Sequence, residues 1–121
     1  MEYIAVGVGG MLGSITRYAL GKWVSERYDT IIPMGTLLIN ISGALLLGIV
    51  SSIYTGGNIY LLLAEGYLGA YTTFSAFMYE GFNLIKANER KNAIIYIFVT
   101  LLLGIIAFII GITAVNMFRL L

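Results

Sequence analysis

Cysteine and histidine are both absent from the 121 residues, and there is a single proline. Without cysteine the chain can form neither disulfides nor thiolate metal sites. Without histidine it lacks the commonest metal ligand and the side chain most often used to shuttle protons near neutral pH. We also find no nucleophile–base pair, no metal-ligand cluster and no phosphate-binding loop, so we expect that the protein is not an enzyme.

Charge is scarce as well. Seven basic and six acidic residues leave a formal net charge of +1, and no basic cluster indicates nucleic-acid binding. Apolar residues, by contrast, make up 60% of the chain, and the mean hydropathy is +0.93. A soluble domain of this length cannot bury so much apolar surface. We therefore expect a single transmembrane domain over residues 1–121, with the lipid bilayer as its solvent.

Four apolar segments are long enough to cross the hydrocarbon core of a bilayer, which takes about 20 residues. They cover residues 3–23, 33–54, 60–85 and 92–118. Charged or turn-forming stretches separate them, and aromatic residues flank their ends as they do at membrane interfaces. The sequence therefore predicts an all-α, multi-pass membrane protein with four transmembrane helices.

Polar residues interrupt the third segment. Residues 69–80 read Gly-Ala-Tyr-Thr-Thr-Phe-Ser-Ala-Phe-Met-Tyr-Glu. Polar groups at membrane depth are costly unless they face other protein or a water-filled path. One interpretation is a polar contact between helices. The other is an ion or substrate site, formed where a helix is broken and its backbone groups are freed.

Two further features fit a path for an anion. Thr36, Asn40 and Gly43 share one stripe of the second segment, and Asn40 can either bond a neighbouring helix or present two N–H donors to an anion. Phe74 and Phe77 are i, i+3 neighbours. Such a pair commonly serves packing, but aromatic ring edges carry partial positive charge and can face an anion.

The first and fourth segments carry small, charged and hydroxylated residues on single faces. Gly9 and Gly13 form a Gly-x-x-x-Gly pair, which permits close helix approach. Arg17 shares a face with Gly10 and Gly13 and can either snorkel to the interface or place a fixed positive charge at a pore vestibule. In the fourth segment, Tyr96 and Thr100 begin a stripe that either packs on other helices or lines a path.

Taken in order, these motifs resemble those of the Fluc (CrcB) family of fluoride channels. The matching pieces are Gly9-Gly10-Met11-Leu12-Gly13 with Arg17-Tyr18, then Pro33-Met34-Gly35-Thr36 with Asn40 and Gly43, then Gly69 through Glu80. The string Thr-Thr-Phe-Ser-x-Phe-x-x-Glu is the most specific of them. The fourth segment matches only in character.

The resemblance implies a channel in the cell membrane that passively exports fluoride and so relieves its toxicity. It implies an antiparallel, dual-topology homodimer with two pores and a broken third helix. Asn40 would match the pore asparagine, and Phe74 and Phe77 the phenylalanines whose edges contact the ion. The backbone carbonyls of Gly69 and Thr72, from both subunits, would match those that hold a central Na+ ion, which is structural and not transported.

The resemblance also implies further pore residues. Arg17 would match the basic residue of the first helix, and Glu80 the acidic residue near the pore. Hydroxyl groups at four positions would complete the path: Thr36, Thr73, Ser75 and Thr100.

The charged loops bear on the partner. One predicted side of the membrane carries Lys22, Arg27, Lys86, Arg90 and Lys91, whereas the other carries Arg119. The positive-inside rule would place the loops that hold the five cations in the cytoplasm. Either this bias is too weak to orient the chain, or the chain pairs with a homologue of opposite bias. We favour the homodimer.

Two other functions compete with the channel. A small proton-coupled multidrug exporter needs a membrane-buried carboxylate early in the chain, but Glu2 and Glu26 lie at the terminus and in a loop. A non-conducting assembly subunit explains the glycines, but it does not explain Asn40 together with the phenylalanines and the polar interruption.

Overall fold

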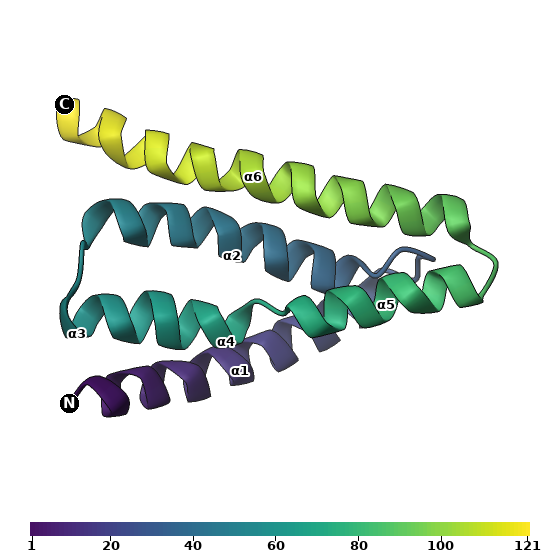
Figure 1. The fold of residues 1–121 in the computed structure, drawn as a ribbon, viewed down its shortest axis with the longest axis horizontal. Coiled ribbons are helices and arrows are strands. Elements are labelled where there is room, and N and C mark those ends of the chain that lie inside the picture. Colours follow the sequence, from purple (N-terminus) through teal and green to yellow (C-terminus); the bar gives the residue numbers. More distant parts are fainter.

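The structure, a computed structural model, describes all of residues 1–121 and is built from helices joined by short connections (Figure 1). In chain order the helices are α1 (Glu2–Arg27), α2 (Met34–Ile53), α3 (Gly57–Tyr60), the π-helix η1 (Leu61–Leu68), α4 (Gly69–Tyr71), α5 (Phe74–Lys86) and α6 (Arg90–Leu120). The all-helical fold predicted from the sequence is confirmed.

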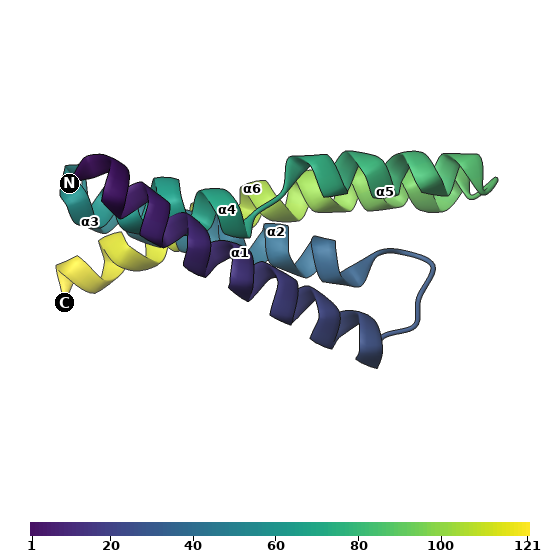
Figure 2. The same ribbon diagram turned by 90° about the horizontal axis from the view of Figure 1, so that it is seen from below.

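The helices run along one long axis, with both termini and α3 at one end (Figure 1). The α1–α2 loop and the α5–α6 turn lie at the other end, which we call the loop end. α2 packs chiefly on α6, and α1 packs chiefly on η1 and α4. Figure 2 shows α1 diverging from α5 toward the loop end. This divergence opens the molecule at the end that carries most of the charged residues.

Two helices, α2 and α6, are long and apolar enough to cross a membrane. The first predicted segment, residues 3–23, falls within the continuous helix α1, whereas the third, residues 60–85, is divided among α3, η1, α4 and α5. Large apolar side chains of α6 are exposed, as lipid-facing residues would be: Phe98, Leu102, Ile105 and Ile109.

Glycines bring α1 and η1 into backbone contact. A Cβ added at Gly9 would meet the carbonyl oxygen of Leu62, and one added at Gly13 would meet the carbonyl oxygen of Tyr67. From the other side, a Cβ at Gly66 would lie 2.7 Å from the carbonyl oxygen of Val6. The close approach predicted from the Gly-x-x-x-Gly pair is therefore present. It fixes η1 and α4, the helical arm that leads to the polar interruption.

Two threonines separate α4 from α5. Thr72 has φ −79° and ψ 155°, and Thr73 has φ −145° and ψ 116°, so both are extended. The hydroxyl oxygen of Thr73 then accepts a hydrogen bond from the backbone N–H of Ala76 at 3.2 Å and caps α5. Threonine suits this position because its side chain replaces a partner that the first turn of a helix lacks.

Candidate functional site

Asn40 on α2 holds the backbone of Thr73 at two points. Its side-chain Nδ2 donates to the carbonyl oxygen of Thr73 at 3.0 Å, and its Oδ1 accepts from the backbone N–H of Thr73 at 2.9 Å. An asparagine amide has two N–H donors. One is therefore engaged by the helix break, and the second remains for another acceptor.

The break leaves backbone oxygens without donors. The N–H and the hydroxyl of Thr72 both donate to the carbonyl oxygen of Leu68, at 3.0 and 2.9 Å. Neither the carbonyl oxygen of Thr72 nor that of Gly69 accepts a hydrogen bond from the turns, caps or side chains of the structure. Both residues line the same cavity, so a cation in that cavity would lie close to the break.

This cavity, which we call the central cavity, has a volume of about 350 Å³. Its lining comes from α2, from the helices on either side of the break and from α6: Asn40, Gly43, Ala44, Leu47, Ala64, Leu68, Gly69, Thr72, Thr73, Phe74, Phe77, Thr100 and Leu101. The lining is mostly apolar, with the polar groups concentrated at the break. A dehydrated ion could meet only a few donors or acceptors here.

Aromatic rings stand at the start of α5. The ring centroids of Phe74 and Phe77 are 6.0 Å apart with planes at 50°, and Phe77 lies 5.3 Å from Tyr96 at 52°. Tilted pairs of this kind direct ring edges toward neighbouring groups. Phe77 is 5% exposed and belongs to the core, whereas Phe74 is 72% exposed on the outside of this chain.

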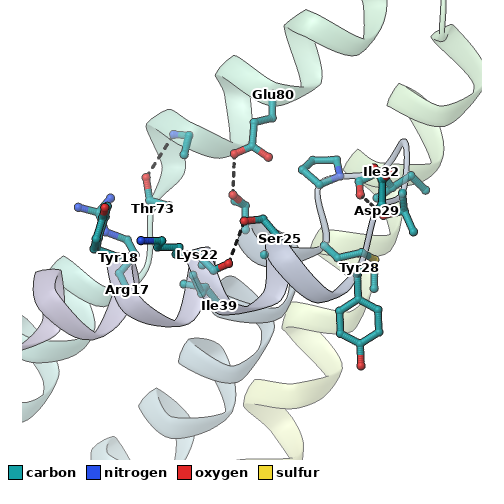
Figure 3. Close-up of a pocket in the computed structure, with 17 residues that line it drawn as sticks. Arg17, Tyr18, Lys22, Ser25, Tyr28, Asp29, Ile32, Ile39, Thr73 and Glu80 are labelled. Carbon is teal, nitrogen blue, oxygen red and sulfur yellow. Dashed lines mark hydrogen bonds between the residues drawn. The ribbon is translucent and has the colours of Figure 1, made fainter.

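A second cavity, the loop-end cavity, opens between α1, the start of α2 and α5, with a volume of about 650 Å³ (Figure 3). Arg17 and Lys22 line it from α1, and Glu80 lines it from α5. Thr73 lines both cavities, so the break lies between them. The loop-end cavity thus carries fixed charge of both signs in front of the polar interruption.

The carboxylate in the loop-end cavity is tied to α2. The hydroxyl of Thr36 donates to Oε1 of Glu80 at 2.7 Å. A hydrogen bond to an ionised acceptor is stronger than one between neutral groups. It holds the carboxylate against α2 and joins two helices that share few other contacts.

The structure groups the predicted residues in two sets. The first set lines the central cavity and consists of Asn40, Thr73, Phe74, Phe77 and Thr100, together with the expected cation ligands Gly69 and Thr72. Arg17, Thr36 and Glu80 line the loop-end cavity.

Two predicted hydroxyl residues differ from the rest. Ser75 lines neither cavity, is exposed, and lies with its Oγ 3.4 Å from the Thr73 hydroxyl. The Thr100 hydroxyl donates to the carbonyl oxygen of Tyr96 at 2.7 Å. Its proton is therefore used within α6, and the hydroxyl oxygen can act only as an acceptor toward any further group.

Two residues outside the predicted set belong to the same surroundings. Tyr96 is fully buried beside Phe77, and its hydroxyl has no hydrogen-bond partner. Its position four residues before Thr100 on one stripe is the signal that could have assigned it to the site. Lys22 lines the loop-end cavity beside Arg17, but in the sequence it stands among ordinary loop charges.

Backbone oxygens are the available cation ligands. The structure contains no group of three or more His, Cys, Asp or Glu side chains that could hold a metal ion. Carbonyl oxygens are the ligands that hard cations prefer. The unpaired oxygens of Gly69 and Thr72 therefore fit a cation such as Na+, although one chain supplies only these two.

Comparison with known proteins gives a consistent result. The family model described as "CrcB-like protein, Camphor Resistance (CrcB)" matches residues 4–112. The chain is 50% identical over 111 residues to "Fluoride-specific ion channel FluC 2" of Clostridium acetobutylicum, covering 92% of this chain and 95% of the relative.

More distant relatives carry similar names. A protein of Moorella thermoacetica, also named "Fluoride-specific ion channel FluC 2", is 39% identical over 109 residues, covering 88% of this chain and 89% of the relative. "Fluoride-specific ion channel FluC" of Acidobacterium capsulatum is 36% identical over 121 residues, covering 96% and 97%. The similarity therefore extends over nearly the whole of each chain.

Proposed function

The chain belongs to the CrcB-like family, and on that premise we propose that it is a fluoride-selective ion channel in a membrane. The observation that carries the proposal is the 50% identity to a protein named as a fluoride-specific ion channel, over 92% of this chain. The geometry of the helix break supports it independently. Asn40, Phe74 and Phe77, whose amide and ring edges suit an anion, all line one mostly apolar cavity there.

Selectivity follows from what replaces water around the ion. Fluoride is small and holds its hydration shell tightly, so a selective path must offer donors that substitute for water. The second N–H of Asn40 and the edges of Phe74 and Phe77 are such groups at the central cavity. Arg17 places a positive charge in the loop-end cavity and attracts anions to its own part of that cavity, whereas Asp29 and Glu80 of the same lining repel them.

A second copy of this chain, inserted in the opposite orientation, completes the site in our proposal. An inverted copy would add its own Gly69 and Thr72 carbonyl oxygens to those of the first. Four oxygens are a better shell for a hard cation than two. We assign this position to a structural Na+ ion that holds the two copies together and is not transported.

The membrane arrangement that fits these features has four spans in the cell membrane. The third span is the run from α3 to α5, interrupted at Thr72 and Thr73. In this arrangement fluoride leaves the cell passively, down its electrochemical gradient, and the protein performs no chemical reaction. Membrane proteins tolerate such an interruption where it lines a cavity, and Thr72 and Thr73 both line the central cavity.

The partner of this chain is either a second copy of itself, which makes a homodimer, or a paired homologue of opposite charge bias. Accessibility of a C-terminal tag from each side of the membrane distinguishes the two. Tags found on both sides support the homodimer, whereas a single orientation in every molecule contradicts it.

Fluoride efflux from proteoliposomes tests the function. With a potassium ionophore to carry the counter-charge, we expect rapid fluoride release without any proton gradient. A proton-coupled multidrug exporter would instead need a pH gradient, and an assembly subunit would release nothing above empty vesicles.

A further inference from the structure

Besides the bond from Asn40 to Thr73, α2 makes a second contact with the break, on the N-terminal side of Thr72. The hydroxyl of Tyr71 and that of Ser42 lie 2.9 Å apart. The Ser42 hydroxyl also donates to the carbonyl oxygen of Ile39 at 3.1 Å, which uses its one proton. Tyr71 is therefore the donor in this pair.

The contact is buried and supported by packing. Tyr71 is 4% exposed and forms a small core with Ile39 and Leu68. Its ring stacks on Tyr67, with centroids 6.0 Å apart and planes at 12°. A hydrogen bond shielded from water and set by a packed ring holds its geometry better than an exposed one.

The two α2 contacts bracket one residue. Asn40 holds Thr73, and Ser42, two positions later on α2, holds Tyr71. Thr72, between them, has an extended backbone and a carbonyl oxygen without a donor. The N–H and the hydroxyl of Thr72 are fixed by the carbonyl oxygen of Leu68, but no hydrogen bond fixes the direction of its own carbonyl oxygen.

We propose that the Tyr71–Ser42 hydroxyl pair, together with the Asn40 amide, orients the carbonyl oxygen of Thr72 for the cation. Tyr71 and Ser42 are positioning residues, since they act through the backbone of Thr72. The inference rests on the proposed sodium site but names residues that the site itself does not include. It predicts that loss of the Tyr71 hydroxyl lowers the affinity for sodium in addition to any loss of stability measured without sodium.

Tyr71→Phe tests the proposal, because it keeps the ring and its stacking on Tyr67 but removes the donor. The readout is the melting temperature of the purified full-length protein in detergent, titrated with NaCl against choline chloride at constant ionic strength. A ligand that binds the folded state raises the melting temperature with concentration. The stabilisation grows as RT ln(1 + [Na+]/Kd), so a fit of the titration gives the sodium Kd, which we call the sodium midpoint. We expect this midpoint to be about fivefold higher in the variant than in the wild type, as for loss of one hydrogen bond.

Tyr67→Phe is the matched control. The Tyr67 hydroxyl donates to Thr16 of α1 at 2.9 Å, so the variant also loses one tyrosine hydrogen bond from the same arm but keeps both α2 contacts. We expect its sodium midpoint to match the wild type. Ser42→Ala, and Ser42→Ala combined with Tyr71→Phe, should both give the midpoint of Tyr71→Phe alone.

Three results would overturn the proposal. An unchanged sodium midpoint in Tyr71→Phe would show that the hydroxyl does not position the site. An equal shift in Tyr67→Phe would show general loosening of the arm. A wild-type melting temperature that does not depend on sodium would show that the protein has no sodium site, whether or not it conducts fluoride. Fluoride flux, measured separately, reports on the channel function and leaves this comparison intact.

Discussion

Asn40 and Thr73, which are 33 residues apart, form a two-point hydrogen bond that joins the middle of α2 to the helix break. The bond ties the residue expected to meet the anion to the segment expected to hold the cation. A change at Asn40 should therefore affect both.

Asn40→Asp replaces a donor with an acceptor. The new carboxylate would face the carbonyl oxygen of Thr73 and offer no N–H to fluoride. We expect fluoride efflux from proteoliposomes to fall by about tenfold or more, because roughly 1.4 kcal/mol of lost hydrogen bonding corresponds to a factor of ten. Asn58→Asp, at an exposed position near the other end, is the control and should leave efflux unchanged. Normal efflux in Asn40→Asp would contradict the assigned path.

Phe77→Ile separates the ring edge from apolar bulk. The ring lies 5.3 Å from Tyr96 in the core, so the change costs some packing as well as the edge. We expect efflux to fall by about threefold to tenfold, the range of one aromatic edge interaction. Phe98→Ile, on the exposed face of α6, should conduct normally. If both variants conduct alike while folding normally, Phe77 serves packing alone.

Thr36→Val removes the only hydroxyl that holds Glu80. The variant has the same shape, but the carboxylate loses a donor 2.7 Å away. Because Glu80 is only partly buried and water can replace part of the bond, we expect the free energy of unfolding to fall by about 1–2 kcal/mol. Thermal unfolding in detergent measures it. Thr30→Val, at an exposed loop position, should lower the free energy of unfolding by less. Equal losses in the two variants would show that the Thr36–Glu80 bond contributes no more to stability than an exposed loop hydrogen bond.

Gly13→Ala probes the backbone contact between α1 and η1. The added Cβ would run into the carbonyl group of Tyr67, so the helices must separate. Overpacking of this kind costs about 1–3 kcal/mol. Gly7→Ala adds the same methyl group where nothing lies within 4 Å, and it should leave stability unchanged or raise it by up to about 1 kcal/mol. A Gly13 variant as stable as the Gly7 variant would show that the contact is looser than the structure has it.

The sequence predicts the helices better than their contacts. Apolar runs locate the helices because burial and lipid exposure both depend on local composition. The Thr72-Thr73 interruption stands out because hydroxyl groups are unusual at membrane depth. The Asn40–Thr73 bond and the Tyr71–Ser42 pair depend on how α2 is rotated against the break, which no local pattern records.

Other parts of the site were hidden for different physical reasons. The sequence places Tyr96 on a stripe that either packs on other helices or lines a path, and it does not show that the hydroxyl is buried and unpaired beside Phe77. The sequence gives Thr100 a hydroxyl but not its direction, and in the structure that hydroxyl donates within α6. A helical threonine can form this local bond or turn its hydroxyl elsewhere, and the structure shows which rotamer Thr100 adopts.

The reversal potential of purified wild-type protein in a planar bilayer, with fluoride on one side and chloride on the other, tests fluoride selectivity most directly. We predict a potential that follows the fluoride gradient and does not move when the chloride concentration is changed. A reversal potential near zero, or one that follows chloride, would contradict fluoride selectivity.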